Sequence, residues 1–428
     1  MPVRVMWFWR DLRLRDLPAL IRAGENADVV PLFVLDPRLL RNGEPTSVVA
    51  ELVREVRADE VHISTETTPY GRRRDDAVAA SLSAAGARLI ATGSPYAIGP
   101  GTLSTKAGPY RVFTPFSRSW RDHGWPAPAH GAQPTWFTGP RSDALPTPPA
   151  TEVPVPECSE SAALHRWAGF LEGGPRLMLA SYGTARNRPD RPGASHMSTG
   201  LKYGTIHPRT MLFDIARHEA AHSAGAERYI TELCWREFYA DVQWHHPASA
   251  GSDYRPLPGM QYDDLTGDTA VLVEAWWAGR TRFPLVDAGM RQLLTEGWMH
   301  YRVRMVTASF LVKDLHVWWP AGARHFLAHL RDGDIASNNH GWQWCAGTGT
   351  DAAPYFRFFN PVAQGKRFDP NGDYVRRYIP ELRHVPGAAV HEPWAILDGC
   401  PHVYPEPIVD RAKQRRETLA RFEEGGGR

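Results

Sequence analysis

Two histidines and a glutamate form the first group of residues that could carry out chemistry. The segment His218-Glu219-Ala220-Ala221-His222 is an HExxH sequence at the end of a helical pattern over 208–221. On a helix, this spacing would place two imidazoles one turn apart with a carboxylate between them, as in zinc proteases. The longer form of the motif needs a third histidine at position 228, where this chain has Arg228, whose charge would repel a metal ion. A zinc protease is therefore a remote alternative, and we predict no metal site.

A second group of such residues lies between positions 332 and 344, where carboxylates, amides and tryptophans are concentrated. This stretch contains Asp332, Asp334, Asn338, Asn339, Trp342 and Trp344. A turn followed by buried aromatic residues would account for the tryptophans but not for the pair of amides. Together with Tyr182, the small polar run 195–199, Arg236 and Arg304, the composition favours a bound polar cofactor that contains a planar ring system.

The first part of the chain has the pattern of a parallel α/β layer. Short apolar runs over 3–9, 29–35, 60–64 and 88–91 predict strands, and helical patterns over 52–57 and 77–85 lie between them. We therefore expect a Rossmann-like α/β domain over 1–125. Nine prolines between positions 126 and 156 predict a linker over 126–160 that continues neither a sheet nor a helix.

After the linker, the apolar residues follow a helical period. Helices are predicted over 162–172, 208–221, 227–244, 271–278, 286–295, 302–318, 323–331 and 408–422. We expect a helical domain over 161–410 and a last helix and tail over 411–428. Nine of the 16 tryptophans lie between positions 235 and 344, so this domain should be built around aromatic surfaces.

Composition excludes several classes of protein. Of the 428 residues, 43% are apolar and 22% are charged, which rules out a disordered chain or a small disulfide-bonded one. The apolar runs are too short to span a membrane, and the four cysteines form no CxxC pair. A cytoplasmic protein with reduced thiols is expected. The net charge of +2 means that any nucleic acid must be bound by a local basic patch.

Several long blocks of the chain resemble the cryptochrome/photolyase family, most closely the class I cyclobutane pyrimidine dimer photolyases. The blocks are WFWRDLRLRDLPAL (7–20), GRRRD (71–75), YGTAR (182–186), LKYGTIHPR (201–209), LCWREFY (233–239), AGMRQLLTEGWMHYRVRMVTASFLVKDL (288–315), GDIASNNHGWQW (333–344) and TGTDAAPYFRFFNP (348–361). The resemblance implies an N-terminal α/β antenna domain and a helical domain that holds FAD. The HExxH segment falls in what resembles a variable helix connection of that family.

The resemblance assigns a set of residues to the flavin. They are Tyr182, Ser195, His196, Met197, Ser198, Tyr229, Arg236, Arg304, Asp332, Asp334 and Asn338. Arginines and hydroxyls suit the pyrophosphate, because charge-assisted hydrogen bonds to phosphate are strong. Asn338 matches the residue that faces the reducible ring nitrogen. The family carries arginine where this chain has His196.

The resemblance also implies a pocket for a pyrimidine dimer that is extruded from UV-damaged DNA. Trp235 and Trp344 match its aromatic walls, Glu232 matches a carboxylate that bonds the damaged base, and Met305 matches a contact beneath it. Arg186 and Arg302 are expected at phosphates or at the pocket rim. The implied reaction is the light-driven transfer of an electron from reduced FAD to the dimer, which then splits. Trp342 and Trp319 match the inner two residues of the tryptophan chain that photoreduces the flavin.

Three positions depart from the family pattern. The outer tryptophan of the chain aligns with Thr266, so photoreduction should stop at Trp319, follow another aromatic residue such as Trp276, or fail. Tyr301 stands where dimer photolyases carry asparagine and is expected at the substrate. After position 40 roughly a helix and a strand are missing, which predicts a sheet one strand short and weak or absent binding of a folate or deazaflavin antenna chromophore.

Two further expectations concern the kind of protein. A blue-light receptor of cryptochrome type would use the same flavin without repair, and Tyr301 and Thr266 favour it. Asn338 and the retained pocket residues Glu232, Trp235, Met305 and Trp344 oppose it, as does the lack of a long tail after the helical domain. We expect a monomer that acts on UV-damaged DNA and does not bind a membrane.

Overall fold

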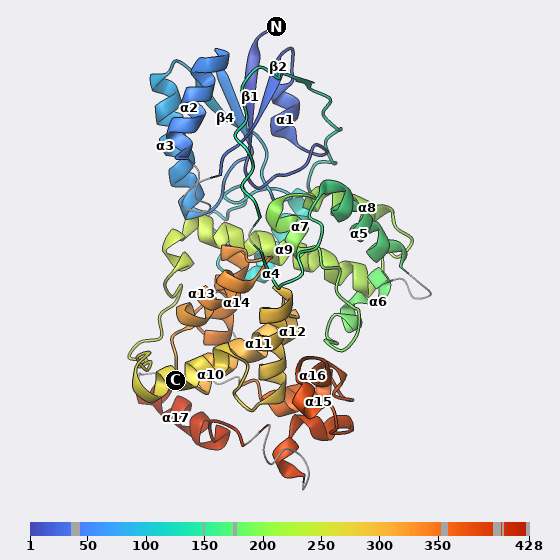
Figure 1. Cartoon of the computed structure of the whole chain (residues 1–428), viewed down its shortest axis with the longest axis vertical. Coiled ribbons are helices and arrows are strands. Elements are labelled where there is room, and N and C mark those ends of the chain that lie inside the picture. Colours follow the sequence, from blue (N-terminus) through green and yellow to red (C-terminus); the bar gives the residue numbers. More distant parts are fainter. Residues whose placement is uncertain are drawn as a thin grey trace.

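The computed structural model describes residues 1–35, 43–148, 150–173, 178–351, 358–396, 404 and 406–424. An α/β layer lies at one end of the molecule and a larger helical part at the other (Figure 1). The strands are β1 (Val3–Phe8), β2 (Asp28–Phe33), β3 (Glu60–Ile63), β4 (Arg88–Ala91) and β5 (Thr135–Trp136). They form one sheet in the order β4-β3-β1-β2-β5, and every pair is parallel. The four strands predicted from the apolar runs are confirmed.

The fifth strand corrects the prediction that the proline-rich segment continues no sheet. Thr135 and Trp136 pair with Asp28 and Val29, and the N–H of Phe137 donates to the Val29 carbonyl at 2.9 Å. A two-residue strand at the edge of a sheet tolerates prolines on either side, because one row of its backbone groups needs no partner. The described sheet thus has five strands, one more than the four that the apolar runs predict. Residues 36–42, where the deletion was inferred, lie outside the described part of the chain.

Helices occur along the whole described chain. They are α1 (Pro18–Ala23), α2 (Pro45–Val56), α3 (Pro69–Ala84), α4 (Phe113–His123), α5 (Glu160–Glu172), α6 (Met178–Ala185), α7 (Ser198–Tyr203), α8 (Pro208–Arg217), α9 (Ala224–His245), α10 (Gly267–Trp277), α11 (Pro284–Glu296), α12 (Tyr301–Lys313), α13 (Trp319–His329), α14 (Ile335–Ala346), α15 (Pro361–Phe368), α16 (Asp373–Tyr378) and α17 (Arg411–Glu424). None of the helices that the structure describes is long and apolar enough to cross a membrane.

Two predicted helices end earlier than expected. The helix expected over 302–318 stops at Lys313, and the chain turns through His316, whose φ is +55°, before α13 begins. The helix expected over 208–221 stops at Arg217, and His218 is extended. The helical periodicity of the sequence continues past Arg217 and past Lys313, because the residues that follow are also apolar or compatible with a helix.

Helix α9 holds the two parts of the molecule together through a buried carboxylate. Glu237 accepts hydrogen bonds from the backbone N–H groups of Ala97, Ile98 and Gly99 at 2.6–3.1 Å, and from the indole of Trp120 at 2.9 Å. Ala97 and Trp120 belong to the same apolar core as the buried face of α9. The segment after β4 therefore packs on the helical part rather than on the sheet.

The loop after β1 makes a second connection, and it requires a glycine. Gly204, at the end of α7, has φ +66°, and a Cβ there would lie 2.1 Å from the carbonyl oxygen of Arg10. Leu12 donates its backbone N–H to the neighbouring Tyr203 carbonyl at 3.1 Å.

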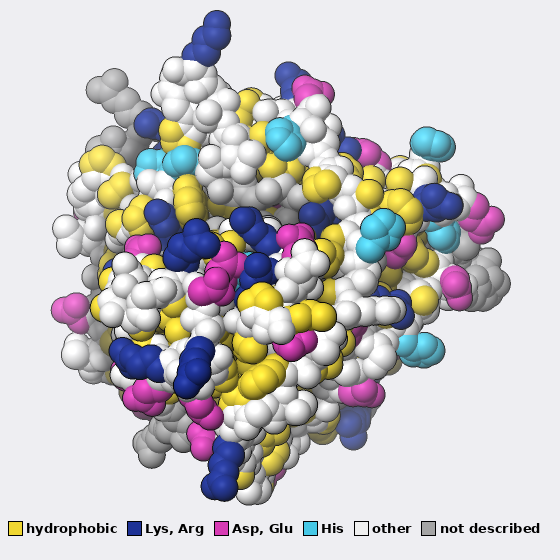
Figure 2. All heavy atoms as spheres, turned by 90° about the horizontal axis from the view of Figure 1, so that it is seen from above, with side chains coloured by type: hydrophobic (Ala, Val, Ile, Leu, Met, Phe, Trp, Pro, Cys, Tyr) yellow, Lys and Arg dark blue, Asp and Glu magenta, His cyan; other side chains and the backbone are white. Residues whose placement is uncertain are grey.

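The face seen from above carries basic and acidic side chains side by side (Figure 2), so no single sign of charge covers it.

We predict that Gly204→Ala destabilises the protein more than the same change at Gly86. Both glycines have positive φ, but nothing lies within 4 Å of a Cβ at Gly86. Left-handed backbone costs alanine about 1–2 kcal/mol, and the contact with Arg10 adds about 1–3 kcal/mol of overpacking. Urea denaturation of both variants measures the difference. Equal losses would show that the α/β layer does not pack this closely against α7.

Candidate functional site

Three helices converge on the candidate site, and each is held at its start by a side-chain cap. Ser223 caps α9 by accepting from the Ala226 N–H, and His300 caps α12 by accepting from the Arg302 N–H. Asp334 caps α14 by accepting from the Ser337 N–H at 3.0 Å. Such caps satisfy backbone donors that have no partner within the helix. They fix where the first turn of each helix points.

A cavity of about 320 Å³ lies between these helices and α13, a size at the lower end of small-molecule sites. Its lining includes ten of the residues selected from the sequence: Glu232, Trp235, Arg236, Tyr301, Arg304, Met305, Asp332, Asp334, Asn338 and Trp342. The sequence analysis missed eight others: Tyr239, Ala308, Phe326, Leu330, Gly333, Ser337, Gly341 and Cys345. Most of the missed residues are small or apolar, and such residues carry no chemical signal in a sequence.

Buried charges make up one side of the cavity. Asp334 forms an ion pair with Arg10 at 3.3 Å, and both side chains are almost fully buried. Burial alone would raise the pKa of the Asp334 carboxyl, but Arg10, Arg236 and Lys202 together hold this pKa well below its usual range. Asp334 is therefore ionised, and it compensates cations from the α/β layer, α7 and α9.

Arg236 and Arg304 are both held in place by other residues. Arg236 donates to the backbone carbonyls of Pro95 and Leu201 at 3.0 and 3.1 Å. Arg304 contacts both carboxylate oxygens of Asp332 at 2.9 and 3.1 Å. A guanidinium has five N–H donors, so each arginine retains donors for a ligand.

Asn338 lies in the second turn of α14, with its amide orientation set by two acceptors. Its side-chain N–H₂ donates to the Ala323 carbonyl at 3.2 Å and to the Asn339 side-chain oxygen at 2.8 Å. The neighbouring Trp342 also lines the cavity, and no described group accepts from its buried indole N–H. Trp319 is fully buried in the same core but does not line the cavity.

The lining residues Glu232 and Tyr301 belong to a network of charged and aromatic residues, which we call the mouth of the cavity. Arg186 donates to Glu232 at 2.5 Å, Arg228 contacts the same carboxylate oxygen at 2.9 Å, and the Arg186 guanidinium lies 4.1 Å from the Tyr301 ring. Glu232 is thus flanked by two arginines. Burial and three nearby arginines lower the pKa of His300, which precedes Tyr301, to about 3, so its imidazole is neutral at pH 7.

Asn187 is a mouth residue that the sequence analysis missed. Its side-chain oxygen accepts from the Tyr301 hydroxyl and from Arg302, both at 2.5 Å. Arg302 also donates to the Tyr301 hydroxyl at 3.0 Å. No sequence pattern pairs residue 187 with residue 301, so this contact could be found only from the fold.

The two expected aromatic walls differ in their surroundings. Trp235 lines the cavity, and Phe113 covers one of its faces with a ring separation of 3.6 Å and an angle of 6°. A planar ligand can therefore stack only on the other face. Trp344 packs against Phe359 at 6.0 Å and does not line the cavity.

The remaining residues assigned to the flavin do not line the cavity but cluster around Tyr229, in the first turns of α9. Ser195 and Tyr229 share a hydrogen bond of 2.8 Å, and the Tyr182 ring lies 4.9 Å from that of Tyr229. Met197 is buried in this core, whereas His196 and Ser198 are exposed. Since Tyr229, Glu232 and Arg236 follow a helical spacing, one face of α9 joins this cluster to the cavity.

The residues present fit the flavin that the resemblance implies. Arg236 and Arg304 can bind a pyrophosphate, Asp332 and Asp334 can accept from hydroxyl and amine donors, and aromatic and aliphatic side chains can enclose a flat ring. The unpartnered indole N–H of Trp342 is a further donor in the same lining. The donor set is that of a phosphorylated cofactor with a planar ring.

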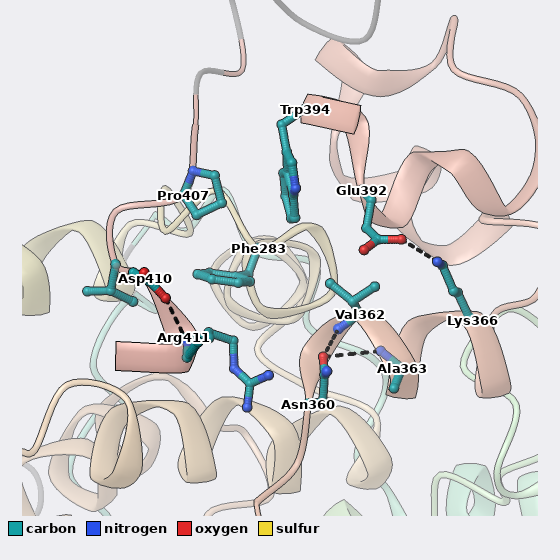
Figure 3. Close-up of a pocket in the computed structure, with 12 residues that line it drawn as sticks. Phe283, Asn360, Val362, Ala363, Lys366, Glu392, Trp394, Pro407, Asp410 and Arg411 are labelled. Atoms are coloured by element: carbon teal, nitrogen blue, oxygen red, sulfur yellow. Dashed lines mark hydrogen bonds and ion pairs between the residues drawn. The ribbon is translucent and has the colours of Figure 1, made fainter. Parts of the chain in front are cut away.

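A larger cavity, of about 510 Å³, lies elsewhere, between α15 and the start of α17. Phe283 and Trp394 approach each other there, and Lys366 pairs with Glu392 (Figure 3). None of the residues selected for chemistry lines it, so we do not assign it a function.

The prediction that the HExxH segment lies on a helix is wrong. His218 lies just after the end of α8, and residues 219–222 form a turn before Ser223 caps α9. The two histidines are therefore not on successive turns of one helix. Among the described residues, no group of three metal-ligating side chains comes together, and these residues offer no zinc site.

Comparisons with known proteins agree with this geometry. Residues 229–424 match the model of the FAD binding domain of DNA photolyase, and residues 4–42 and 39–134 match that of DNA photolyase. A deoxyribodipyrimidine photo-lyase from Streptomyces griseus is 37% identical over 474 aligned positions that cover 100% of each chain. A class III photolyase structure from Agrobacterium tumefaciens is 32% identical, with a TM-score of 0.86 over 99% of this chain and 98% of that one. A Synechocystis cryptochrome structure is 25% identical, with a TM-score of 0.85 over 98% and 99%.

The comparisons also bear on the inferred deletion. The DNA photolyase model matches in two pieces that meet at residues 39–42. The alignment to the Streptomyces griseus relative has more positions than this chain has residues. The first finding supports a segment missing near position 40, and the second shows that this chain lacks residues that the relative has.

We predict that Asp334→Asn destabilises the protein by about 3–5 kcal/mol at pH 7, because it leaves buried arginines without a counter-charge. The pKa of Asp334 is lower in the folded than in the unfolded protein. Its charge therefore stabilises the fold at pH values above the unfolded pKa of about 4, and this stabilisation is lost as the pH falls below that value. Denaturation at pH 7 and below pH 4 measures both effects.

The control for this prediction is Asp373→Asn, which removes a half-exposed partner of Arg376 and should cost at most about 0.5 kcal/mol. A loss at Asp334 no larger than at Asp373, or one that grows toward acid pH, would contradict the assignment.

Proposed function

The chain belongs to the DNA photolyase family, and on that premise we propose that it is a light-driven lyase that splits cyclobutane pyrimidine dimers in UV-damaged DNA. The observation that carries the proposal is the single cavity in which Glu232, Trp235 and Met305 lie together with Asn338, Arg304 and Trp342. The first three suit a damaged base, and the others suit a flavin. Both partners of an electron transfer would be held in one enclosed space.

The cofactor is FAD, which supplies a light-excited electron donor when it is bound in its reduced form. We propose that Arg236 and Arg304 bind its phosphates, and that Asp332, Asp334 and Asn338 bind its polar edges. The same proposal includes Tyr182, Tyr229 and the segment Ser195, His196, Met197 and Ser198. It is supported by the face of α9 that joins this cluster to the cavity. The exposure of His196 and Ser198 makes them the least enclosed members.

At the substrate side, the protein must hold a dimer that has left the base stack. Extrusion costs a few kcal/mol, and stacking on an aromatic side chain returns about 1–3 kcal/mol per base. Only the face of Trp235 that Phe113 leaves open is available for this. We propose that Glu232, held by Arg186 and Arg228, accepts a hydrogen bond from the base, and that Met305 and Tyr301 limit the space around it.

A cluster of arginines beside the mouth supports DNA as the partner. Arg302 and Arg367 both lie over the Phe368 ring, at 4.5 and 5.0 Å. Arg188 pairs with the Asp190 carboxylate, and Arg377 donates to the Asp190 carbonyl at 3.4 Å. With Arg186 and Arg228, this makes six arginines near four acidic residues, Asp190, Glu232, Asp369 and Asp373. The excess of arginine makes a local basic patch of the kind that binds phosphates. Trp344, outside the cavity lining, would contact the substrate only from its rim.

We further propose that one chain is sufficient and that it works in the cytoplasm. Cys158, Cys234 and Cys345 are free thiols, as expected in a reducing compartment. Weak or absent antenna binding is supported by the segment missing near position 40.

A photoreceptor without repair activity is the second candidate, and one observation favours it. Tyr301, which lines the cavity, is held by Asn187 and Arg186, and its ring is bulkier than the asparagine that the resemblance leads one to expect there. The open face of Trp235 and the paired Glu232 favour repair, since a receptor has no need of a base-binding wall.

We predict that the protein carrying reduced flavin restores thymines in dimer-containing DNA under blue light and not in the dark. Chromatography of the digested DNA measures the restored thymine. Reduction with dithionite before illumination removes any dependence on photoreduction. Dimers that persist under light, with flavin bound and reduced, would contradict repair and leave the photoreceptor as the better candidate.

We predict that Trp235→Ala weakens binding of dimer-containing DNA by about 1–3 kcal/mol, or roughly 5- to 150-fold, because one stacking surface is lost. Fluorescence anisotropy with a labelled oligonucleotide measures the affinity, and absorbance measures retained flavin. Trp136→Ala is the matched control, since Trp136 is a partly exposed tryptophan on β5. Equal affinity of the Trp235 variant and the parent protein would remove Trp235 from the pocket.

A further inference from the structure

One residue next to the inner tryptophans is placed to replace the missing outer one. Position 266, where the family's outer tryptophan aligns, is a threonine that precedes α10. Trp318, by contrast, is 40% exposed and directly precedes α13, whose first residue is the fully buried Trp319. The two indole rings are 6.4 Å apart at an interplanar angle of 68°. They are therefore in edge contact, with one at the surface and one in the core.

A single carboxylate binds both of these indoles. Asp253 accepts from the Trp319 N–H at 2.7 Å through one oxygen and from the Trp318 N–H at 3.3 Å through the other. Loss of an electron makes an indole N–H far more acidic. A carboxylate already bonded to that N–H is a base that can take the proton without any movement of the side chain.

Trp319 is connected to Trp342 through one face of α13. Trp319, Gly322 and Phe326 follow a helical spacing, and a Cβ at Gly322 would lie 2.2 Å from the Trp342 ring. Phe326 also contacts Trp342, with ring centroids 5.0 Å apart. The glycine allows the Trp342 ring to lie directly on the helix that carries Trp319. Trp342 itself lines the flavin cavity.

A second pair of tryptophans offers a competing route, and its surroundings are less suitable. The ring centroids of Trp276 and Trp342 are 6.1 Å apart, and Trp277 follows Trp276 in the chain. The Trp276 indole donates to the backbone carbonyl of Thr307 at 3.2 Å, which cannot accept a proton. For the buried indole N–H of Trp277, no acceptor is found among the described residues. The His325 ring packs on both indoles, at 5.7 and 5.6 Å between centroids. Among the described residues, however, neither indole N–H of this pair is hydrogen-bonded to a side-chain base that could take its proton.

We propose that Trp318 is the terminal electron donor of this protein and that Asp253 holds the proton released on its oxidation. This inference rests on the proposed function, since it needs a flavin in the cavity. One electron moves from Trp342 to the light-excited oxidised flavin, one from Trp319 to Trp342, and one from Trp318 to Trp319. The vacancy at Trp318 is filled by one electron from a thiol reductant in solution, and the proton on Asp253 returns to the indole.

The test compares Trp318→Phe with the matched variant Trp277→Phe, both with oxidised flavin and a thiol. Flavin absorbance under blue light gives the photoreduction rate. We expect about a tenfold or greater loss for Trp318→Phe, equivalent to about 1.4 kcal/mol or more on the barrier, and the parent rate for Trp277→Phe. The ratio of flavin to protein in each sample confirms that the variants fold and bind the cofactor. An unchanged rate in Trp318→Phe, or a loss confined to Trp277→Phe, would overturn the proposal.

A readout on the protein itself completes the experiment. Without thiol, illumination in air should leave oxidised indole products, which peptide mass spectrometry should locate at Trp318 and not at Trp277. Asp253→Asn, which keeps the shape but removes the base, should reduce the yield at Trp318. Products at Trp277 alone would also overturn the proposal. Repair by the dithionite-reduced parent protein is measured in parallel: its failure would contradict the proposed function, whereas failure of the light-driven reduction step alone would contradict only the relay.

Discussion

The buried ion pair of Asp334 with Arg10 is the constraint on which the architecture of the site depends. Arg10 follows β1 in the α/β layer, and Asp334 begins α14 in the helical part. An ionised pair in this position is costly unless its remaining hydrogen-bonding groups are satisfied. Asp334 meets this requirement by capping α14, so the same carboxylate that joins the two layers also sets the start of the helix that carries Asn338 and Trp342. Folding of the layers and construction of the cavity are therefore coupled.

Much of the fold could be predicted because it follows local periodicity. The four long strands and most of α9 are visible in the sequence as apolar runs and helical repeats. Helix α14 was not predicted as a helix, since Asn338, Asn339 and Gly341 are poor helix formers. Its stability comes from the Asp334 cap and from packing against α12 and α13, which are tertiary effects. Strand β5 was missed for a related reason: only pairing with β2 makes two residues between prolines a strand.

The candidate site also divides into features that the sequence predicts and features that depend on tertiary contacts. Family blocks selected ten of the cavity residues, because their side chains are chemically distinctive. They could not show that Phe113 covers one face of Trp235, or that Asn187 binds Tyr301, because these contacts join residues more than a hundred positions apart. The HExxH interpretation failed at the local level, since α8 ends one residue before the motif. A short motif has little specificity unless the helix that it requires is present.

A threonine at position 266, where the resemblance leads one to expect a tryptophan, need not disconnect the core from the surface. An electron path requires only neighbouring rings and not a given position in the chain. Two pairs of adjacent tryptophans approach Trp342, one from α10 and one from α13. What distinguishes them is the fate of the proton. An oxidised indole whose N–H is bonded to no side-chain base must keep its positive charge, which is unfavourable away from water. An indole bonded to Asp253 can instead release its proton and become neutral. Position of the base, more than ring separation, therefore favours the route that ends at Trp318.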